Sequence, residues 1–266
     1  MKKLNDDQIK DRLFEILIFF DSFCKKNDLQ YTLDAGTLLG AARHKDFIPW
    51  DDDIDVAMPF NDYKKLISLS KNIDPNGKFV MHGYSKKINN KENYIYPFLK
   101  LENSRTMAKI SIAHDKGGAW IDIFPLNYVP DNQREFLKYV QKFNRLHDLI
   151  GIADAKKNEN PLKASLRWVI RRGSNLYRNK MINLMYSLDT VKSSRVEDIV
   201  WATNREHDFF PAEILEEYTT LEFRGRKFKV VKDYDKYLTI EYGNWRKLPP
   251  KNERVSHHGY ELFDLD

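Results

Sequence analysis

The stretch LDAGTLLGAARHKDFIPWDDDIDVAMPFNDY, residues 33–63, contains four aspartates within the five positions 51–55. Acidic and apolar residues alternate over residues 53–58, and this period of two predicts a strand with one polar and one apolar face. Side chains two positions apart on a strand share a face. The carboxylates of Asp53 and Asp55 are therefore expected to converge on one side of a sheet, with the apolar residues between them in the core.

So much negative charge in one place needs a positive partner. Two like charges about 4 Å apart repel by about 1 kcal/mol in water and by about 4 kcal/mol at an effective dielectric constant of 20. A divalent cation fits, because Mg²⁺ binds one or two carboxylates together with phosphate oxygens. The alternative is a solvated acidic turn that the nearby cations Arg43, Lys45 and Lys64 balance.

Gly36 and Thr37 precede these acids at a predicted turn from a strand into a helix. The strand is predicted over residues 31–34, and small and apolar residues predict a short helix over residues 37–43. Glycine lets a ligand approach the backbone closely, and the first amides of a helix face an anion. The turn suits a phosphate group, although an ordinary turn explains the same two residues.

A third carboxylate lies further along the chain, in AWIDIFPL at residues 119–126. Asp122 has apolar and aromatic neighbours typical of a buried strand, where a carboxylate needs a partner. If this strand lies beside residues 53–58, Asp122 completes a three-carboxylate site for one or two divalent ions. Such a site can neutralise the charge of a phosphate and activate an attacking hydroxyl.

Helices and strands alternate through the first half of the chain. A helix is predicted over residues 5–27, with Asn5 as its cap and Gln8 reaching back to the cap. The other predicted elements are a helix capped by Asn61 and running to residue 71, and strands over residues 79–84, 94–101 and 119–126. From residue 131 onward the pattern is mostly helical. We therefore expect an α+β protein with a catalytic core of residues 1–130 and a mostly helical C-terminal region, residues 131–266, that completes the substrate site.

Composition and charge exclude only a few classes of protein. The chain has 266 residues, of which 42% are hydrophobic, so it can bury a substantial core. The formal charge of +5 favours an anionic partner. The longest purely apolar run, residues 16–20, is far shorter than the roughly 20 residues of a membrane span, and no signal peptide is recognisable. A single cysteine excludes an internal disulfide. We expect a cytoplasmic protein.

Positive charge concentrates in residues 156–180, where eight lysines and arginines accompany one acid, Glu159. Lys163, Arg167 and Arg171 follow helical spacing opposite an apolar face, which predicts a basic amphipathic helix or a pair of helices. Two interpretations stay open. The segment is either a bundle helix with a solvated face, or a surface that contacts an anionic acceptor or the anionic lipid at the inner face of the membrane.

Three segments together resemble a known family. GTLLGAARHKDFIPWDDDIDVAM closely resembles the signature of the LicD family, and AWIDIFPL and YGNWRKLPP resemble its later segments in the same order, so that the resemblance spans roughly residues 30–260. It implies a nucleotidyltransferase-like fold, a mixed sheet flanked by helices. It also implies a phosphotransferase that moves phosphocholine, or a similar alcohol phosphate, from CDP-choline or another CDP-linked donor and releases CMP. The implied acceptor is a hydroxyl of a glycan or lipid-linked glycan, a precursor of teichoic acid, capsule or lipopolysaccharide.

The resemblance implies roles for individual residues. Asp53 and Asp55 match the paired metal-binding acids of the family, which hold one or two Mg²⁺ or Mn²⁺ ions. Asp122 matches the third acid, a metal ligand that also helps to deprotonate the acceptor. Gly36 and Thr37 match the turn that contacts phosphate.

Further site residues are expected from their chemistry. Arg43 and Lys45 are expected to bind the diphosphate, because arginine forks onto phosphate and lysine supplies a point charge. Lys100, on an otherwise apolar strand, faces either the same cavity or solvent. An aromatic cage would favour choline as the transferred alcohol, and Trp50, Trp120, Trp201 and Tyr84 are candidates for it. His257 and His258 either reach the substrate or are solvated.

Other functions fit the same residues less well. A nucleotidyltransferase with the same carboxylates would transfer NMP from an NTP to a small hydroxylated acceptor and release pyrophosphate; it is the main alternative. An EF-hand begun by Asp51 is excluded, because Val56 stands where glycine is needed and Pro59 interrupts the loop. Nucleic-acid binding is not expected, because the basic segment has few aromatics and no known motif.

Overall fold

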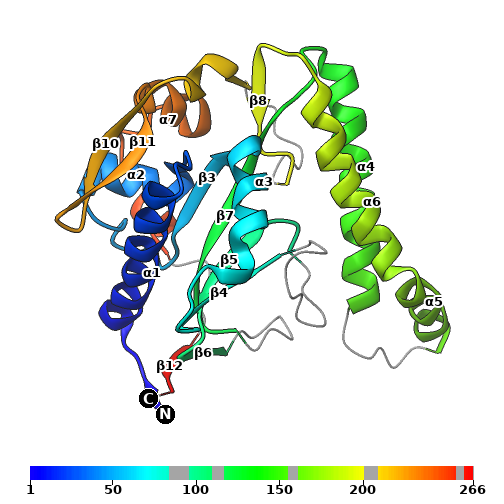
Figure 1. Ribbon diagram of the computed structural model, residues 1–266, viewed down its shortest axis with the longest axis horizontal. Helices are drawn as coiled ribbons and strands as arrows, with labels where there is room; N and C mark the ends of the chain where they lie inside the picture. The colour runs from blue at the N-terminus through cyan, green and yellow to red at the C-terminus, as the bar shows by residue number, and fades with distance from the viewer. Residues whose placement is uncertain (84–95, 110–116, 155–160, 201–208, 256–260, 266) are drawn as a thin grey trace.

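The structure of this chain is a computed structural model that describes residues 1–83, 96–109, 117–154, 161–200, 209–255 and 261–265 (Figure 1). Its centre is a mixed sheet of seven described strands in the order β2-β3-β7-β5-β4, with β8 beside β7 and β9 beside β8. These strands are β2 (Thr32–Leu33), β3 (Asp55–Pro59), β4 (Phe79–His82), β5 (Leu99–Asn103), β7 (Ala119–Tyr128), β8 (Arg195–Glu197) and β9 (Phe210–Pro211). β3 and β7 run parallel, and the other neighbours run antiparallel.

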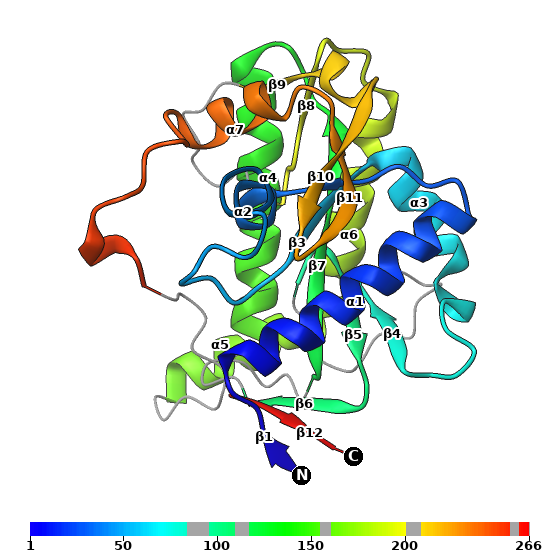
Figure 2. The same cartoon turned by 90° about the vertical axis from the view of Figure 1, so that its left-hand side faces the viewer.

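Helices cover both faces of this sheet. In the described part they are α1 (Asp6–Lys26), α2 (Ala35–His44), α3 (Phe60–Leu69), α4 (Gln133–Asp154), α5 (Pro161–Arg172), α6 (Ser174–Ser187) and α7 (Tyr234–Tyr242). Figure 2 shows α1 crossing one face of the sheet while α4 and α6 lie behind it. Strands and helices are thus mixed along the chain, and the α+β prediction is confirmed.

Two small sheets complete the described fold. β1 (Lys2–Lys3), β12 (Glu261–Asp264) and β6 (Thr106–Lys109) join the two ends of the chain in the order β1-β12-β6. β10 (Tyr218–Phe223) and β11 (Arg226–Val231) form an antiparallel hairpin. Short 3₁₀ turns occupy Ser70–Asn72, Leu188–Thr190, Ala212–Leu215 and Lys251–Glu253.

The helix predicted at the N-terminus is confirmed together with its cap. The backbone N–H of Gln8 donates to Asn5 Oδ1 at 2.9 Å, and the backbone N–H of Asn5 donates to Gln8 Oε1 at 3.1 Å, so α1 begins with a capping box. The predicted cap of α3 is wrong. Its N-cap is Pro59 rather than Asn61, because β3 runs directly into the helix and Pro59 keeps an extended ψ of 136° at the junction.

The acid-rich strand begins two residues later than predicted, so Asp53 lies just before it rather than on it. β3 spans Asp55–Pro59, and Ile54 and Val56 are 1% and 0% exposed. The N–H of Asp122 donates to the carbonyl of Ile54 at 2.9 Å, so the two aspartate strands are neighbours, as expected. β4 and β7 begin where predicted, although β4 ends at His82 and β7 continues to Tyr128. β5 begins only at Leu99, and residues 84–95 of the predicted strands lie outside the described residues.

The region after residue 130 contains the predicted helices and also strands that the periodicity did not reveal. β8 and β9 have three and two residues, too few for a period to appear. The hairpin β10-β11 turns at Arg224 and Gly225, whose φ angles of 49° and 74° are typical of a two-residue hairpin loop. An Arg-Gly pair is not among the common signals for such a turn, so the hairpin was missed.

The described part of the basic segment, residues 161–180, lies in a pair of helices, α5 and α6, joined at Gly173. No helix in the described ranges combines the length and apolar character needed to cross a bilayer. The expected cytoplasmic location and the boundary near residue 130 remain predictions.

Gly40 lets the loop before the acidic strand pack against α2. A Cβ at this position would lie 2.5 Å from the carbonyl oxygen of Asp46 and 3.3 Å from the backbone nitrogen of Ile48. We expect Gly40→Ala to cost about 1–3 kcal/mol, because backbone atoms cannot yield as a flexible side chain does. Thermal unfolding measures the loss.

Gly151→Ala is the matched control for that substitution. Gly151 lies inside α4, and its added Cβ would meet nothing within 4 Å. Alanine is the better helix former by about 1 kcal/mol, so the melting temperature should rise. Equal melting temperatures for the two variants would contradict the tight packing at Gly40.

Candidate active site

One row of polar side chains crosses four strands of the sheet. Asp55 on β3 is directly opposite Asp122 on β7, Asp122 is opposite Lys100 on β5, and Lys100 is opposite His82 on β4. Directly opposite residues share a face of a sheet. Register alone therefore places two acids and two basic groups side by side, in the order acid, acid, lysine, histidine. The N–H of Asp34 donates to the carbonyl of Asp55 at 3.0 Å, which brings another acid to the end of this row.

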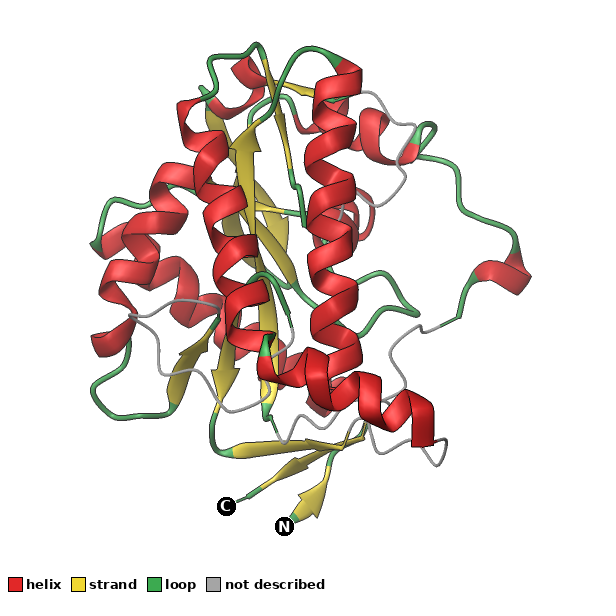
Figure 3. Ribbon diagram, turned by 90° about the vertical axis from the view of Figure 1, so that its right-hand side faces the viewer, coloured by secondary structure: helices red, strands yellow, loops and turns green. Residues whose placement is uncertain are grey.

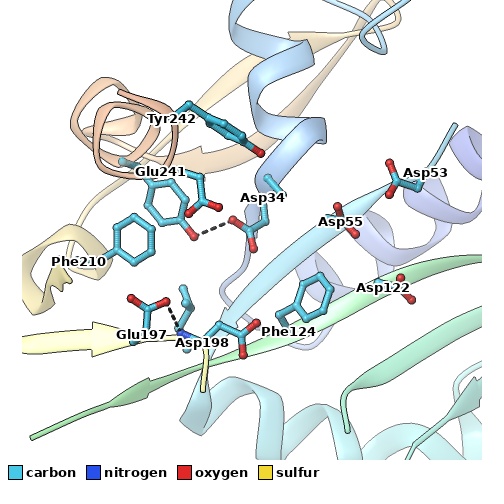
Figure 4. A pocket seen from close by; sticks show the side chains of 13 residues that line it. Asp34, Asp53, Asp55, Asp122, Phe124, Glu197, Asp198, Phe210, Glu241 and Tyr242 are labelled. Atoms are coloured by element: carbon cyan, nitrogen blue, oxygen red, sulfur yellow. Dashed lines mark hydrogen bonds between the residues drawn. The ribbon is translucent and has the colours of Figure 1, made fainter. Parts of the chain in front are cut away.

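A pocket of about 350 Å³ opens beside the acidic end of the row (Figure 4). Seven carboxylates line it: Asp34, Asp53, Asp55, Asp122, Glu197, Asp198 and Glu241. The other described lining residues are Ala35, Phe124, Leu126, Phe210, Tyr237 and Tyr242. Acids that are far apart in the sequence thus share one cavity, and its character is strongly anionic.

Lys100 supplies positive charge to this row. Its Nζ lies 3.3 Å from Asp122 Oδ1, and the lysine side chain is only 8% exposed. The ammonium also lies 3.8 Å from the ring centroid of Tyr96 and 4.1 Å from that of Trp120. Aromatic faces and a carboxylate both stabilise a buried cation, so Lys100 is firmly placed beside Asp122.

Asp55 is an acid of the pocket whose ionisation is strongly opposed. Burial raises the pKa of its carboxyl well above the usual 3.8, and repulsion from Asp53, Asp122, Asp34 and Asp51 raises it further. The backbone at Asp55 is fixed from α2, because the N–H of Asp55 donates to Thr37 Oγ1 at 2.8 Å. The site therefore keeps an acid where neighbouring charges oppose its ionisation.

The turn at the start of α2 is built around carboxylates. A Cβ on Gly36 would lie 2.5 Å from Asp51 Oδ2, so glycine is needed here for Asp51 to approach the first turn of the helix. The hydroxyl of Thr37 is buried and accepts the bond from Asp55. Both residues thus position aspartates, and their predicted contact with phosphate remains a prediction.

Neither Arg43 nor Lys45 is among the described residues that line the pocket. Arg43 donates from Nη1 to the carbonyl of Trp245 at 2.9 Å and from Nε to His44 Nε2 at 3.0 Å, and burial lowers its pKa. Lys45 ends α2 with a mostly exposed side chain, 3.9 Å from Glu222. Their role toward a diphosphate remains a prediction.

Comparisons with known proteins identify the family of this site. The sequence model described as LicD/FKTN/FKRP, nucleotidyltransferase domain, matches residues 28–143. The lipopolysaccharide cholinephosphotransferase LicD of Haemophilus influenzae is 26% identical over 275 aligned positions that cover all of both chains. Both matches support a member of the LicD family. An uncharacterized protein of Rickettsia prowazekii shares 34% identity over 68 residues, 22% of this chain and 26% of that protein.

The family match covers only part of the residues that form the pocket. Glu197, Asp198, Phe210, Tyr237, Glu241 and Tyr242 line it from positions beyond the matched range. None of them was predicted as a site residue. A signal existed for two, since Tyr242 is the first residue of the YGNWRKLPP segment that resembles the LicD family, and Glu241 immediately precedes it. Asp34 lies within the opening stretch but was given no role.

Tyr237 joins this C-terminal wall to the acidic strand. Its hydroxyl donates to Asp34 Oδ1 at 2.7 Å, and both residues are buried. Burial raises the pKa of the tyrosine well above 10, and the charge of Asp34 raises it further, so the hydroxyl stays protonated and remains a donor. Tyr237 also stacks on Phe210 with ring centroids 4.0 Å apart.

We expect Tyr237→Phe to destabilise the protein by about 1–3 kcal/mol, because a buried carboxylate loses one of its donors while the ring stacking is retained. Thermal or denaturant unfolding measures the change. Tyr234→Phe on the same helix is the control, since no hydrogen bond of its hydroxyl is recorded in the described part. A Tyr237→Phe variant as stable as that control would contradict the contribution of the bond.

The donor set of the pocket suits a hard divalent cation. All its acidic groups are carboxylates, the ligands that Mg²⁺ and Mn²⁺ prefer, and burial together with repulsion from neighbouring acids raises the pKa of Asp55. In the described part of the chain, no three His, Cys, Asp or Glu side chains are gathered closely enough to hold an ion as they stand. Mg²⁺ needs only one or two carboxylates when phosphate oxygens complete its shell, so Asp53 and Asp55 fit it.

Several predicted contributors cannot be placed. Trp201, Tyr84, His257 and His258 lie outside the described residues. Trp50 is partly buried, and Trp120 contacts Lys100 rather than forming an open cage.

Proposed function

We propose that this LicD family member is a metal-dependent phosphotransferase. It moves phosphocholine, or a similar alcohol phosphate, from a CDP-linked donor to a hydroxyl of a cell-surface glycan precursor and releases CMP. The observation that carries the proposal is the registered row of Asp55, Asp122 and Lys100 at the edge of an acidic pocket. The full-length relative in Haemophilus influenzae, named a lipopolysaccharide cholinephosphotransferase, supports the same chemistry.

The core that we propose for this reaction is nucleotidyltransferase-like. The arrangement that supports it is a strand, β2, followed by the glycine-containing start of α2 and then by the acid-bearing strand β3. The third acid lies on the parallel neighbour β7. The description of the matching family as a nucleotidyltransferase domain agrees with this interpretation.

Three acids of the pocket have proposed roles. Asp53 and Asp55 hold one or two Mg²⁺ or Mn²⁺ ions, which neutralise the charge of the donor diphosphate when bound. Asp122 accepts the proton of the acceptor hydroxyl, and Lys100 keeps that carboxylate ionised and oriented. The acceptor oxygen forms a bond to the distal phosphorus as the bond from that phosphorus to CMP breaks. Positioning of the reactants and neutralisation of their charge account for the catalysis of such a transfer, and no enzyme residue becomes phosphorylated.

The chemistry of the pocket wall favours choline over ribitol or glycerol as the transferred alcohol. Phe210, Tyr237 and Tyr242 contribute aromatic rings beside Glu197 and Glu241. A quaternary ammonium is attracted both by aromatic faces and by carboxylates, whereas a polyol gains nothing from the rings. Figure 4 shows Phe210, Tyr242, Glu197 and Glu241 across the cavity from Asp53 and Asp122.

The experiment that tests the function measures donor binding and product release. CDP-choline, CDP-ribitol and CDP-glycerol are compared for protection against thermal unfolding, because a ligand at ~100 times its dissociation constant adds about 2.7 kcal/mol. CDP-choline with Mg²⁺ should protect best, and CMP should appear only when a glycan acceptor such as lipopolysaccharide is present. Chelation with EDTA should abolish transfer, and Mn²⁺ should restore it.

The main alternative predicts different products. A nucleotidyltransferase would release pyrophosphate from CTP or another NTP and would need no CDP-alcohol. Pyrophosphate release without CMP release from any CDP-alcohol would overturn the proposed function and leave the nucleotidyltransferase.

A further inference from the structure

A second cavity lies away from the acidic pocket, between α4 and α6. Its volume is about 520 Å³. The described residues that line it are Lys142, Arg145, Leu146, Lys180, Asn183, Leu184 and Ser187. Three cations and two neutral polar groups thus surround two leucines, and no carboxylate is among them. The cavity suits a phosphate-bearing group with apolar material next to it.

The cations belong to regular stripes along both helices. On α4, Lys138, Lys142 and Arg145 are spaced i, i+4, i+7 and are all exposed. On α6, Leu176 and Lys180 have the same i, i+4 spacing, and both are exposed. Residues at these spacings share one face of a helix. Figure 3 shows α4 and α6 side by side with α5 across their ends, as a layer on the outside of the sheet.

Large apolar side chains are exposed on the same helical layer. Trp168, Val169 and Leu176 are 58%, 60% and 54% exposed, and Ile152 near the end of α4 is 44% exposed. The guanidinium of Arg172 lies 3.8 Å from the ring centroid of Trp168. Apolar side chains and an exposed tryptophan flanked by cations are the composition of a helix that lies in a membrane interface.

We propose that the outer face of α4, α5 and α6 binds the surface of an anionic phospholipid bilayer. Lys138, Lys142, Arg145 and Lys180 meet the headgroup phosphates, and Trp168, Val169 and Leu176 enter the interface. Charge complementarity alone would also admit a polynucleotide, but that partner leaves the exposed aliphatic side chains without a role. The inference does not depend on the proposed phosphotransfer, because none of these residues lines the acidic pocket.

Vesicle co-sedimentation tests the proposal on the full chain. Vesicles of phosphatidylcholine alone are compared with vesicles that contain 30% phosphatidylglycerol, at several salt concentrations. We expect binding to the anionic vesicles only, and weaker binding as salt rises, because screening shortens the range of attraction. Equal binding to both vesicles, or none to either, would overturn the proposal.

Two variants and a matched control locate the contact. Lys142→Glu/Lys180→Glu should weaken binding at least tenfold, and Trp168→Gln should weaken it with less change in salt dependence. Lys71→Glu/Arg226→Glu makes the same charge change at exposed positions elsewhere and should bind like the parent. Melting temperatures show whether each variant folds. If the control loses as much affinity as the helical-face variant, or if RNA displaces the vesicles while Trp168→Gln binds normally, the proposal fails.

Discussion

Replacing Asp55 with asparagine is expected to reduce phosphotransfer about a hundredfold to a thousandfold and, at the same time, to raise the melting temperature. Activity falls because the side chain proposed to hold the metal and to balance the donor charge loses its negative charge, and losses of 10²–10³ are usual when one such group is removed. Stability rises because Asp55 is repelled by Asp53, Asp122, Asp34 and Asp51 in the ligand-free protein. Asparagine keeps the shape and removes the repulsion.

The stability gain should depend on pH in a defined direction. The pKa of Asp55 in the folded protein is raised well above 3.8, so from about pH 4 up to that raised pKa the folded state keeps a proton that the unfolded state has lost. The parent protein therefore loses stability from this group as pH rises through that window, and the full penalty is present above it. The gain from Asp55→Asn should be near zero at the acid end and should grow as pH rises through the window.

Asp28→Asn is the control for both measurements. Asp28 is exposed and has a φ of 50°, a conformation that asparagine accepts readily. This variant should transfer phosphocholine and unfold like the parent. Full activity in Asp55→Asn would refute the proposed metal site, and a lower melting temperature at neutral pH would refute the repulsion. Mg²⁺ should stabilise the parent more than Asp55→Asn, which separates the two effects.

Local patterns in the sequence predicted the acid-bearing half of the pocket, because its geometry follows from strand periodicity. Alternation over residues 53–58 placed Ile54 and Val56 in the core, and the structure confirms this arrangement. The buried setting of Asp122 predicted a strand beside the first, which the parallel pairing of β3 and β7 confirms. Period and register act over a few residues, so single-sequence analysis can detect them.

The opposite wall could not be predicted because tertiary packing assembles it. Tyr237 lies about 200 positions from its partner Asp34, and Asp198 reaches the cavity from the end of the three-residue strand β8. No local pattern links such residues. Lys100 is an intermediate case: its apolar strand was recognised, but only the register with Asp122 shows that it faces the row of acids rather than solvent.

Replacing Lys100 with methionine is expected to be the most destabilising of the charge changes in this row. Lys100 is the nearly buried cation beside Asp122, and breaking a buried ion pair by removing one partner typically costs about 3–5 kcal/mol. Methionine retains the length of the side chain and its packing against Tyr96 and Trp120. The loss in free energy of unfolding therefore measures the effect of removing the charge. Unfolding by denaturant measures it, and phosphotransfer should fall together with stability.

The double variant Lys100→Met/Asp122→Asn distinguishes the structural role of the pair from its chemical role. The double variant removes the Asp122 carboxylate together with the cation that balanced it. Much of the stability lost in Lys100→Met should therefore return. Activity should not return, because Asp122 is the proposed acceptor of the hydroxyl proton and asparagine cannot take it. Recovery of stability without recovery of transfer would show that Lys100 serves Asp122, and through it the reaction. A double variant that transfers at the parent rate would show that the pair only holds β5 and β7 together.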